Sequence, residues 1–184
     1  MTGVLTTLSL ATLLAWLAAC AIGVVAANGV AVPAGAVLGL ACALALRNSI
    51  GVTGAVALLA PFGVLLPALA TRQMAIRLGV DFPTFTTAEL LVFLAIYVWF
   101  LSTTFGITPG QPYRLGYAPL PVALMVLALC AYGALTGNWF IPLVAVLGQL
   151  GWVMGWGSSN WFDYVTHVLL VPVVVVTLIL RLLA

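Results

Sequence analysis

No charged side chain occurs between Met1 and Leu46, a stretch long enough to cross a lipid bilayer twice. The rest of the chain is similar, because 65% of its 184 residues are hydrophobic and only 4% are charged. A soluble domain carries about a quarter charged residues, and so few charges cannot cover the surface of a folded chain of this size in water. The composition therefore predicts an integral membrane protein and excludes a soluble enzyme, a nucleic-acid-binding protein and a disulfide scaffold.

Apolar runs along the chain predict the number of membrane crossings. A helix needs about 20 apolar residues to cross a bilayer core about 30 Å thick. Seven runs reach or approach this length, and they predict an all-α, polytopic fold with seven transmembrane helices and short loops in a single domain over residues 1–184. The second and sixth runs are the weakest, so six helices plus a re-entrant segment is the alternative. The runs cover residues 4–27, 30–46, 50–70, 90–108, 120–135, 139–156 and 161–183.

Three local patterns predict how helices begin, end and pack. Thr86 and Glu89 have the spacing of a capping box, in which each side chain accepts a hydrogen bond from the other's backbone N–H. The Thr-Gly-Asn sequence at 136–138 is typical of the turn that follows a helix. Gly35 and Gly39 form a GxxxG pair, which we expect to mark a close contact between two helices.

Three prolines lie inside predicted helices rather than at their starts. Pro61 and Pro67 fall in the third run and Pro172 falls in the seventh. Proline within a helix produces a kink, and a kink frees backbone carbonyls that neighbours or water must satisfy. We therefore expect bent helices at these positions.

The charged side chains lie mostly at or beyond the ends of the runs, where they meet lipid headgroups. We predict that Arg72, Arg77 and Arg114 are headgroup anchors, so membrane lipids are expected partners. The formal net charge is +2, and the arginines do not form the cluster that a nucleic-acid-binding protein needs. The expected location is the cell (inner) membrane, as a multi-pass protein with no nucleic-acid partner.

The seventh run carries the most unusual polar residues. His167 is the only histidine of the chain, and a helical rise of about 1.5 Å per residue would place it about 9 Å into the membrane. Asn160, Asp163 and His167 are spaced i, i+3, i+7, which puts them on one helix face, and Asp163 and His167 could share a hydrogen bond. Because histidine changes charge near physiological pH, we interpret this face as solute-binding or proton-titrating. The alternative is a hydrogen bond that only stabilises the bundle.

The sixth run is expected to complete this group. If the chain turns within residues 157–160, His167 lies level with Leu150, next to Gln149, the only amide deep in any run. Asn160 also fits a helix N-cap, with Asp163 in the first turn. The predicted solute-binding or proton-titrating site consists of His167, Asp163, Gln149, Asn160, Trp152, Trp156 and Tyr164.

The residue inventory limits the chemistry of such a site. The chain has no lysine for a retinal Schiff base and only one histidine, which is too few for bis-histidine haem. A zinc site needs three or four ligands, and the carboxylates are too scattered, so no metal site is predicted and no cofactor follows from the sequence. An intramembrane enzyme with Asp163 and His167 as acid and base lacks a credible nucleophile, which argues against catalysis without settling it.

Two functions remain for the chain as a whole. The first is a transporter or channel for a small neutral or weakly ionised solute, with a proton link through His167. The alternative is a non-catalytic subunit of a larger membrane complex that contacts protein, lipid, quinone or pigment. Other membrane subunits, or further copies of the same chain, are partners that the sequence leaves open.

Overall fold

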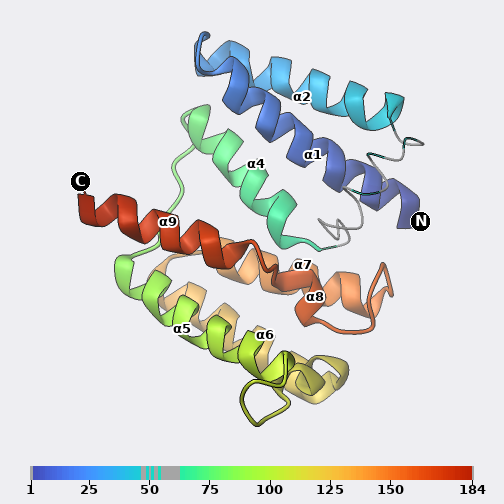
Figure 1. Cartoon of the computed structure of the whole chain (residues 1–184), viewed down its shortest axis with the longest axis vertical. Coiled ribbons are helices and arrows are strands. Elements are labelled where there is room, and N and C mark those ends of the chain that lie inside the picture. Colours follow the sequence, from blue (N-terminus) through green and yellow to red (C-terminus); the bar gives the residue numbers. More distant parts are fainter. Residues whose placement is uncertain (1, 47–48, 50, 52–53, 55–62, 184) are drawn as a thin grey trace. The chain divides into compact units, whose positions relative to one another are not determined.

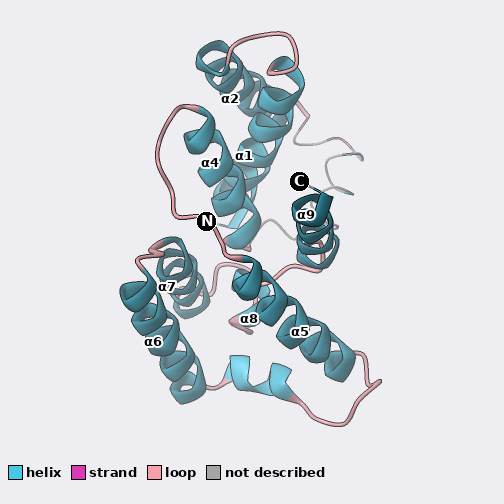
Figure 2. Cartoon of the chain, turned by 90° about the vertical axis from the view of Figure 1, so that its left-hand side faces the viewer, coloured by secondary structure: helices cyan, strands magenta, loops and turns pink. Residues whose placement is uncertain are grey.

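Most of the residues that the structure describes are helical. The computed structural model describes residues 2–46, 49, 51, 54 and 63–183, and among these residues there is no strand (Figures 1 and 2). The prediction of an all-α fold is confirmed. The helices are α1 Thr2–Ile22, α2 Asn28–Ala45, α4 Leu65–Arg77, α5 Thr87–Thr104, the 3-10 helix η1 Pro112–Tyr117, α6 Pro119–Thr136, α7 Phe140–Val153, α8 Phe162–Val165 and α9 Leu170–Leu183.

Seven transmembrane helices are not confirmed within the described residues. Most of the third run, including Pro61, lies outside them, and α4 begins only at Leu65, which puts Pro67 in its first turn rather than at a kink. The sixth run forms a helix of only 14 residues. Four segments are long and apolar enough to cross a membrane: Asn28–Ala45, Thr87–Thr104, Pro119–Thr136 and Phe162–Leu183.

Two compact units can be distinguished in the chain. The first contains Met1–Phe82 and Leu150–Ser158, and the second contains Pro83–Gln149 and Ser159–Ala184. Each unit is described below by itself. That residues 1–184 form one transmembrane domain stays a prediction.

In the first unit, α1 and α2 lie side by side and their backbones approach closely (Figure 1). Gly35 and Gly39 on α2 are buried against Ala15 and Ala19 of α1, and a Cβ atom on either glycine would collide with the α1 backbone. Small residues permit this approach, and the van der Waals contact it creates is a main source of helix association in lipid. The helix contact predicted from the GxxxG pair is confirmed.

This contact predicts the effect of a larger side chain at Gly39. Gly39→Val should push α1 and α2 apart and destabilise the protein by about 1–3 kcal/mol, as overpacking does elsewhere. Thermal unfolding of the detergent-solubilised protein measures the change. Gly29→Ala is the matched control, because Gly29 lies on the same helix with open space around it. Equal stability of the Gly39→Val protein and the wild type would show that the close approach is absent.

In the second unit, the first turn of α5 is fixed by side chains. Thr86 Oγ1 accepts a hydrogen bond from Glu89 N at 3.2 Å, and Glu89 Oε2 accepts one from Thr86 N at 2.6 Å. The predicted capping box is confirmed. The other carboxylate oxygen, Glu89 Oε1, accepts a 2.6 Å hydrogen bond from the Tyr132 hydroxyl of α6. Glu89 therefore starts α5 and ties it to α6.

Two further contacts hold the same end of the second unit. Arg181 on α9 donates to Phe85 O at 2.7 Å and to Thr87 Oγ1 at 3.1 Å, so its charge is tied to the start of α5. Gly137 ends α6 in the left-handed conformation, with φ of 74°, as the predicted turn requires. These contacts position α5, α6 and α9 around the polar residues described next.

The seventh predicted helix is interrupted. The chain is helical over Phe162–Val165 and again from Leu170, and residues 166–169, here called the α8–α9 break, are not helical. Pro172 explains the position of the break, because its ring clashes with the carbonyl four residues earlier, at Val168, and it has no N–H to donate. Within α9, Pro172 is the third residue, where no intrahelical donor is needed. The kink expected at Pro172 is thus a break that begins before it.

Candidate functional site

The polar residues at the start of the seventh run hold the loop that contains η1. The Asn160 side chain is fully buried; its Nδ2 donates to Tyr113 O at 2.8 Å and its Oδ1 accepts from Phe162 N at 2.9 Å. The neighbouring Trp161 N donates to Gly116 O at 2.9 Å. The bond to Phe162 is the local turn that asparagine favours, so Asn160 both shapes its own segment and fastens η1 to it.

Gly116 is required where η1 meets this segment. It is buried, and a Cβ atom built on it would collide with Asn160 Oδ1 and with the ring of Phe162. The close approach brings the η1 backbone within reach of the Asn160 side chain. We call Tyr113, Gly116, Asn160, Phe162 and Asp163 the η1–α8 cluster.

Within this cluster, a phenol and a carboxylate form a direct pair. The Tyr113 hydroxyl donates to Asp163 Oδ1 at 2.8 Å. Burial raises the pKa of Tyr113 well above its usual value, and the hydrogen bond and the negative charge of Asp163 raise it further. The phenol therefore remains protonated at neutral pH and acts as a hydrogen-bond donor to Asp163.

Aromatic rings surround the pair. Phe162 lies 4.7 Å from Phe100 and 5.4 Å from Trp161 between ring centroids, and Phe100 also lies 6.1 Å from both Tyr97 and Tyr113. Such contacts contribute about 0.5–1.5 kcal/mol each beyond the area they bury. The rings link α5, η1 and α8.

The α8–α9 break contains the second polar group of the unit. His167 Nδ1 accepts a hydrogen bond from Leu169 N at 3.2 Å, and Leu170 N donates to His167 O at 2.9 Å. The first N–H groups of a helix have no intrahelical acceptor. The imidazole supplies an acceptor for one of them, the Leu169 N–H at the start of α9. An accepting Nδ1 makes the neutral ring carry its proton on Nε2.

Two hydroxyl groups lie beside the histidine. Thr166 Oγ1 donates to Phe162 O at 2.8 Å, across the end of α8. The Tyr97 side chain of α5 is hydrogen-bonded with Thr166 and is 5% exposed. The break therefore combines an imidazole, two hydroxyls and backbone groups released from the helix, all within a segment that is otherwise apolar.

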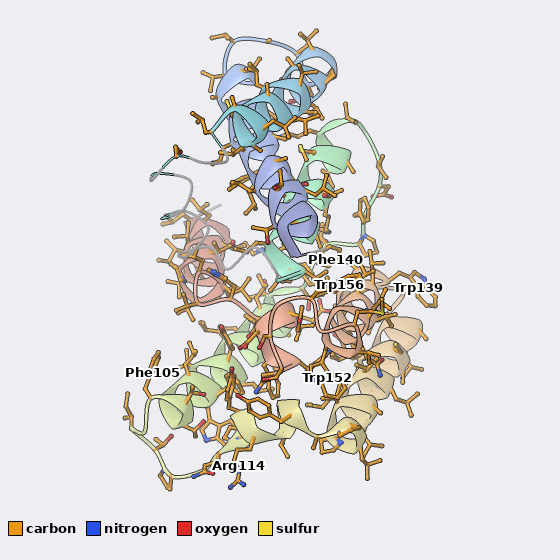
Figure 3. All side chains as sticks on the ribbon, turned by 90° about the vertical axis from the view of Figure 1, so that its right-hand side faces the viewer. Phe105, Arg114, Trp139, Phe140, Trp152 and Trp156 are labelled. Carbon is orange, nitrogen blue, oxygen red and sulfur yellow. The ribbon has the colours of Figure 1, made fainter. Side chains whose placement is uncertain are left out.

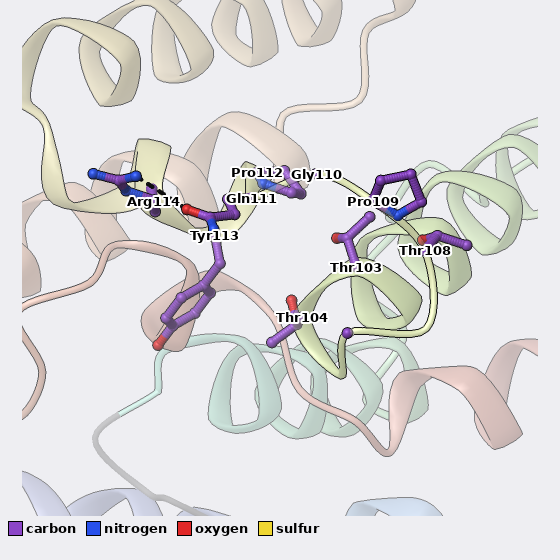
Figure 4. Close-up of a pocket in the computed structure, with 10 residues that line it drawn as sticks. Thr103, Thr104, Thr108, Pro109, Gly110, Gln111, Pro112, Tyr113 and Arg114 are labelled. Carbon is purple, nitrogen blue, oxygen red and sulfur yellow. Dashed lines mark hydrogen bonds between the residues drawn. The ribbon is translucent and has the colours of Figure 1, made fainter.

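A pocket lies next to the η1–α8 cluster, where the loop after α5 leads into η1 (Figure 4). Its volume is about 510 Å³, within the range of small-molecule sites. Tyr113 belongs to both the pocket and the η1–α8 cluster, because it is one of the residues that line the pocket and its hydroxyl bonds Asp163 in the cluster. The pocket is lined by Thr103, Thr104, Gly106, Thr108, Pro109, Gly110, Gln111, Pro112, Tyr113 and Arg114.

The structure changes how the predicted site residues are related. Asn160, Asp163 and His167 do not share one helix face, because Asn160 precedes α8 and His167 lies in the break that Pro172 causes. The predicted N-cap role of Asn160 is wrong, because the N-cap of α8 is Trp161. The Asn160 side chain instead bonds Phe162 N in the turn before α8 and Tyr113 O in η1. Tyr164 is fully buried on α8.

The expected alignment of the last hairpin is also wrong. Gly148 packs against Val165, with Trp161 and Tyr164 close by. A symmetric hairpin would pair Gly148 with a residue farther from the turn. α7 ends at Val153, and the connection from there to α8 is not helical. A role for Gln149, the next residue, stays a prediction.

The predicted residues also divide between the two units. Trp152 and Trp156 belong to the first unit, and Gln149, Asn160, Asp163, Tyr164 and His167 belong to the second (Figure 3 labels both tryptophans). Apart from Arg114, which is predicted as a headgroup anchor, the sequence predicts no site role for the residues of η1. Their only sequence signal is the unusual density of proline, glycine and tyrosine in 109–119.

Among the residues described, no three histidine, cysteine, aspartate or glutamate side chains lie close enough to hold a metal ion. No protein-family model matches the chain, and neither a curated protein nor a solved structure matches it.

The burial of Asn160 predicts a large effect of its removal. Asn160→Ala leaves Tyr113 O and Phe162 N without partners and should destabilise the protein by about 1–3 kcal/mol. Thr177→Ala is the control, because this hydroxyl bonds only the backbone of its own helix turn, at Val173 O. Thermal unfolding in detergent measures both. Equal effects of the two substitutions would contradict the role assigned to Asn160.

The Tyr113–Asp163 pair predicts a pH dependence at alkaline pH. Because folding raises the pKa of Tyr113, its stabilising contribution is complete below the ordinary phenol pKa of about 10 and is lost as pH rises through the folded-state value. Tyr113→Phe removes this contribution. The melting temperatures of wild type and Tyr113→Phe should therefore differ at about pH 8, and the difference should shrink as pH rises above about 10. A difference that grows with pH would contradict the pairing.

Proposed function

We propose that the protein is a multi-pass integral protein of the cell membrane that transports a small neutral or weakly ionised solute, with a proton link at His167. The observation that carries the proposal is the interruption of the apolar segment Phe162–Leu183 at the histidine. In membrane transporters, discontinuous helices expose backbone groups that bind solutes or coupling ions. Non-helical backbone at membrane depth is tolerated where protein or water satisfies it.

The geometry at His167 suggests how protonation would act. The neutral ring accepts the Leu169 N–H through Nδ1. A proton on Nδ1 turns this acceptor into a donor, so the hydrogen bond at the start of α9 is lost. Protonation would then release Leu169 and let the break rearrange. In this proposal, protonation of the His167 ring changes the conformation of the backbone that faces the solute.

The surroundings of the break support a neutral or weakly ionised solute. Thr166 and Tyr97 offer hydroxyl groups that donate and accept hydrogen bonds. The one carboxylate of α8, Asp163, is bonded to Tyr113 rather than placed in the break. Hydroxyls and a neutral imidazole match uncharged polar groups, because a full charge at this depth would require a stronger counter-charge.

Substitution of His167 tests the proposal. Purified protein in liposomes is assayed by light scattering for entry of glycerol and urea, and with an internal pH dye for acetate and methylamine. Histidine titrates between about pH 5 and pH 8, so the wild-type flux of at least one probe should change several-fold across this range. His167→Ala and His167→Gln should both abolish the pH dependence, and Thr177→Ala, on the following helix, should retain it.

Two results would contradict the proposal. One is a flux that does not change with pH and that persists in both the His167→Ala and the His167→Gln protein. The other is the absence of flux for every probe, together with partner chains or a pigment that co-purify in a fixed ratio. The second result would favour the alternative function, a non-catalytic subunit of a larger membrane complex.

A further inference from the structure

The pocket between the end of α5 and η1, here called the α5–η1 pocket, has a lining suited to an oxyanion. Arg114 Nη1 donates to Gln111 Oε1 at 3.0 Å, which holds the guanidinium against the rim (Figure 4). Arg114 is exposed and projects outward from η1 (Figure 3). A guanidinium has five N–H donors in a planar fork, so four of them remain for a ligand, in the geometry that a phosphate group accepts.

Arg114 differs in this respect from the other arginines described. Arg77 donates to Ala19 O and Cys20 Sγ, both at 3.4 Å. Arg181 is bonded to the start of α5, and Arg72 lies 5.6 Å above the ring of Phe82. Those three side chains have partners on other segments of the protein, whereas the partner of Arg114 is a side chain of the same loop.

The negative groups near the pocket are already bonded. Asp163 is not one of the lining residues, and its Oδ1 accepts the Tyr113 hydroxyl. The carbonyls at the end of α5 are bonded by the loop that follows, through Gly106 N to Thr103 O at 3.1 Å and Ile107 N to Ser102 O at 2.8 Å. The lining therefore has one positive charge and no acidic side chain.

The place of the pocket in the chain fixes its depth. It lies in the connection between α5 and α6, and both helices are long and apolar enough to cross a membrane. The connection between two consecutive transmembrane helices lies at one membrane surface, at the level of lipid phosphates. Arg114 then meets these phosphates from a preformed pocket rather than from a bare helix end.

We propose that the α5–η1 pocket binds a phosphate-bearing anion through Arg114, with Gln111 as the residue that positions the guanidinium. An anionic phospholipid headgroup and free phosphate are the two sources of this chemistry. The inference rests on the membrane location in the proposed function but not on transport. A lipid bound here would contact the loop that contains η1, which Asn160 already bonds, and so would stabilise the second unit.

Ligand-induced thermal stabilisation tests the pocket. The full chain in an uncharged detergent is unfolded with short-chain phosphatidylglycerol, short-chain phosphatidylcholine, glycerol or inorganic phosphate added. We expect phosphatidylglycerol to raise the melting temperature. Arg114→Gln should weaken its apparent affinity about tenfold, as the loss of one charged hydrogen-bonding group does, and Arg114→Lys should retain part of it because a point charge lacks the planar fork.

The control removes the same charge elsewhere. Arg181→Gln should leave the phosphatidylglycerol shift at its wild-type size, even if loss of the bonds to Phe85 O and Thr87 Oγ1 makes the unliganded protein melt at a lower temperature. An equal shift with inorganic phosphate would identify free phosphate as the ligand, and a shift with phosphatidylglycerol alone would identify the lipid. An equal shift in Arg114→Gln and wild type, or no shift with any phosphate-bearing probe, would overturn the inference. Because the assay involves no flux, its result is independent of the transport test.

Discussion

Hydrocarbon offers no hydrogen-bond partner to a peptide group, and this constraint applies to every segment of the chain that crosses a membrane. Each backbone N–H or C=O left unpaired in a bilayer costs several kcal/mol. Helices satisfy these groups within one segment, and the described residues include four helices long and apolar enough to cross a membrane. Exceptions need side chains as substitutes, and the α8–α9 break has them, because His167 accepts the Leu169 N–H and Thr166 donates to Phe162 O.

The same requirement explains why polar side chains cluster in the second unit. Asn160, fully buried, bonds the backbone of both Tyr113 and Phe162, and Asp163 receives the Tyr113 hydroxyl. Tyr113 lines the α5–η1 pocket as well. One side chain therefore connects a pocket at the end of two candidate transmembrane helices with the short helix that precedes the break. Binding at the pocket and rearrangement of the break would both act on α8.

Local features could be predicted from the sequence, because neighbouring residues determine them. The capping box of Thr86 and Glu89, the turn at Gly137 and the glycine contact of α2 depend on residues within a few positions of one another, or on the absence of a side chain. The all-α fold follows from the composition and the length of the apolar runs. Among the described residues four candidate spans are found. Most of the third run lies outside those residues, and the sixth forms a helix of 14 residues because run length does not show where a helix stops.

Non-local features could not be predicted in this way. The hydrogen bonds of Asn160 and Asp163 reach residues about 50 positions earlier, and η1 has no periodic pattern that would reveal its partners. The sequence predicts a kink at Pro172 rather than a break over residues 166–169, because a proline shows that a helix is disturbed but not how many residues become unwound. A symmetric connection between α7 and α8 predicts the wrong partner for Gly148, which packs against Val165.

The sole histidine of the chain accepts a backbone N–H at an interruption of an apolar segment that is long enough to cross a membrane. Nitrogen NMR of histidine- and leucine-labelled protein in lipid nanodiscs tests it directly, since one ring gives one set of signals. The account predicts a neutral ring protonated on Nε2 at about pH 8, and a shift of the Leu169 amide signal when the ring is protonated near pH 5. A neutral ring protonated on Nδ1, or a Leu169 amide signal that does not shift when the ring is titrated, would contradict this account.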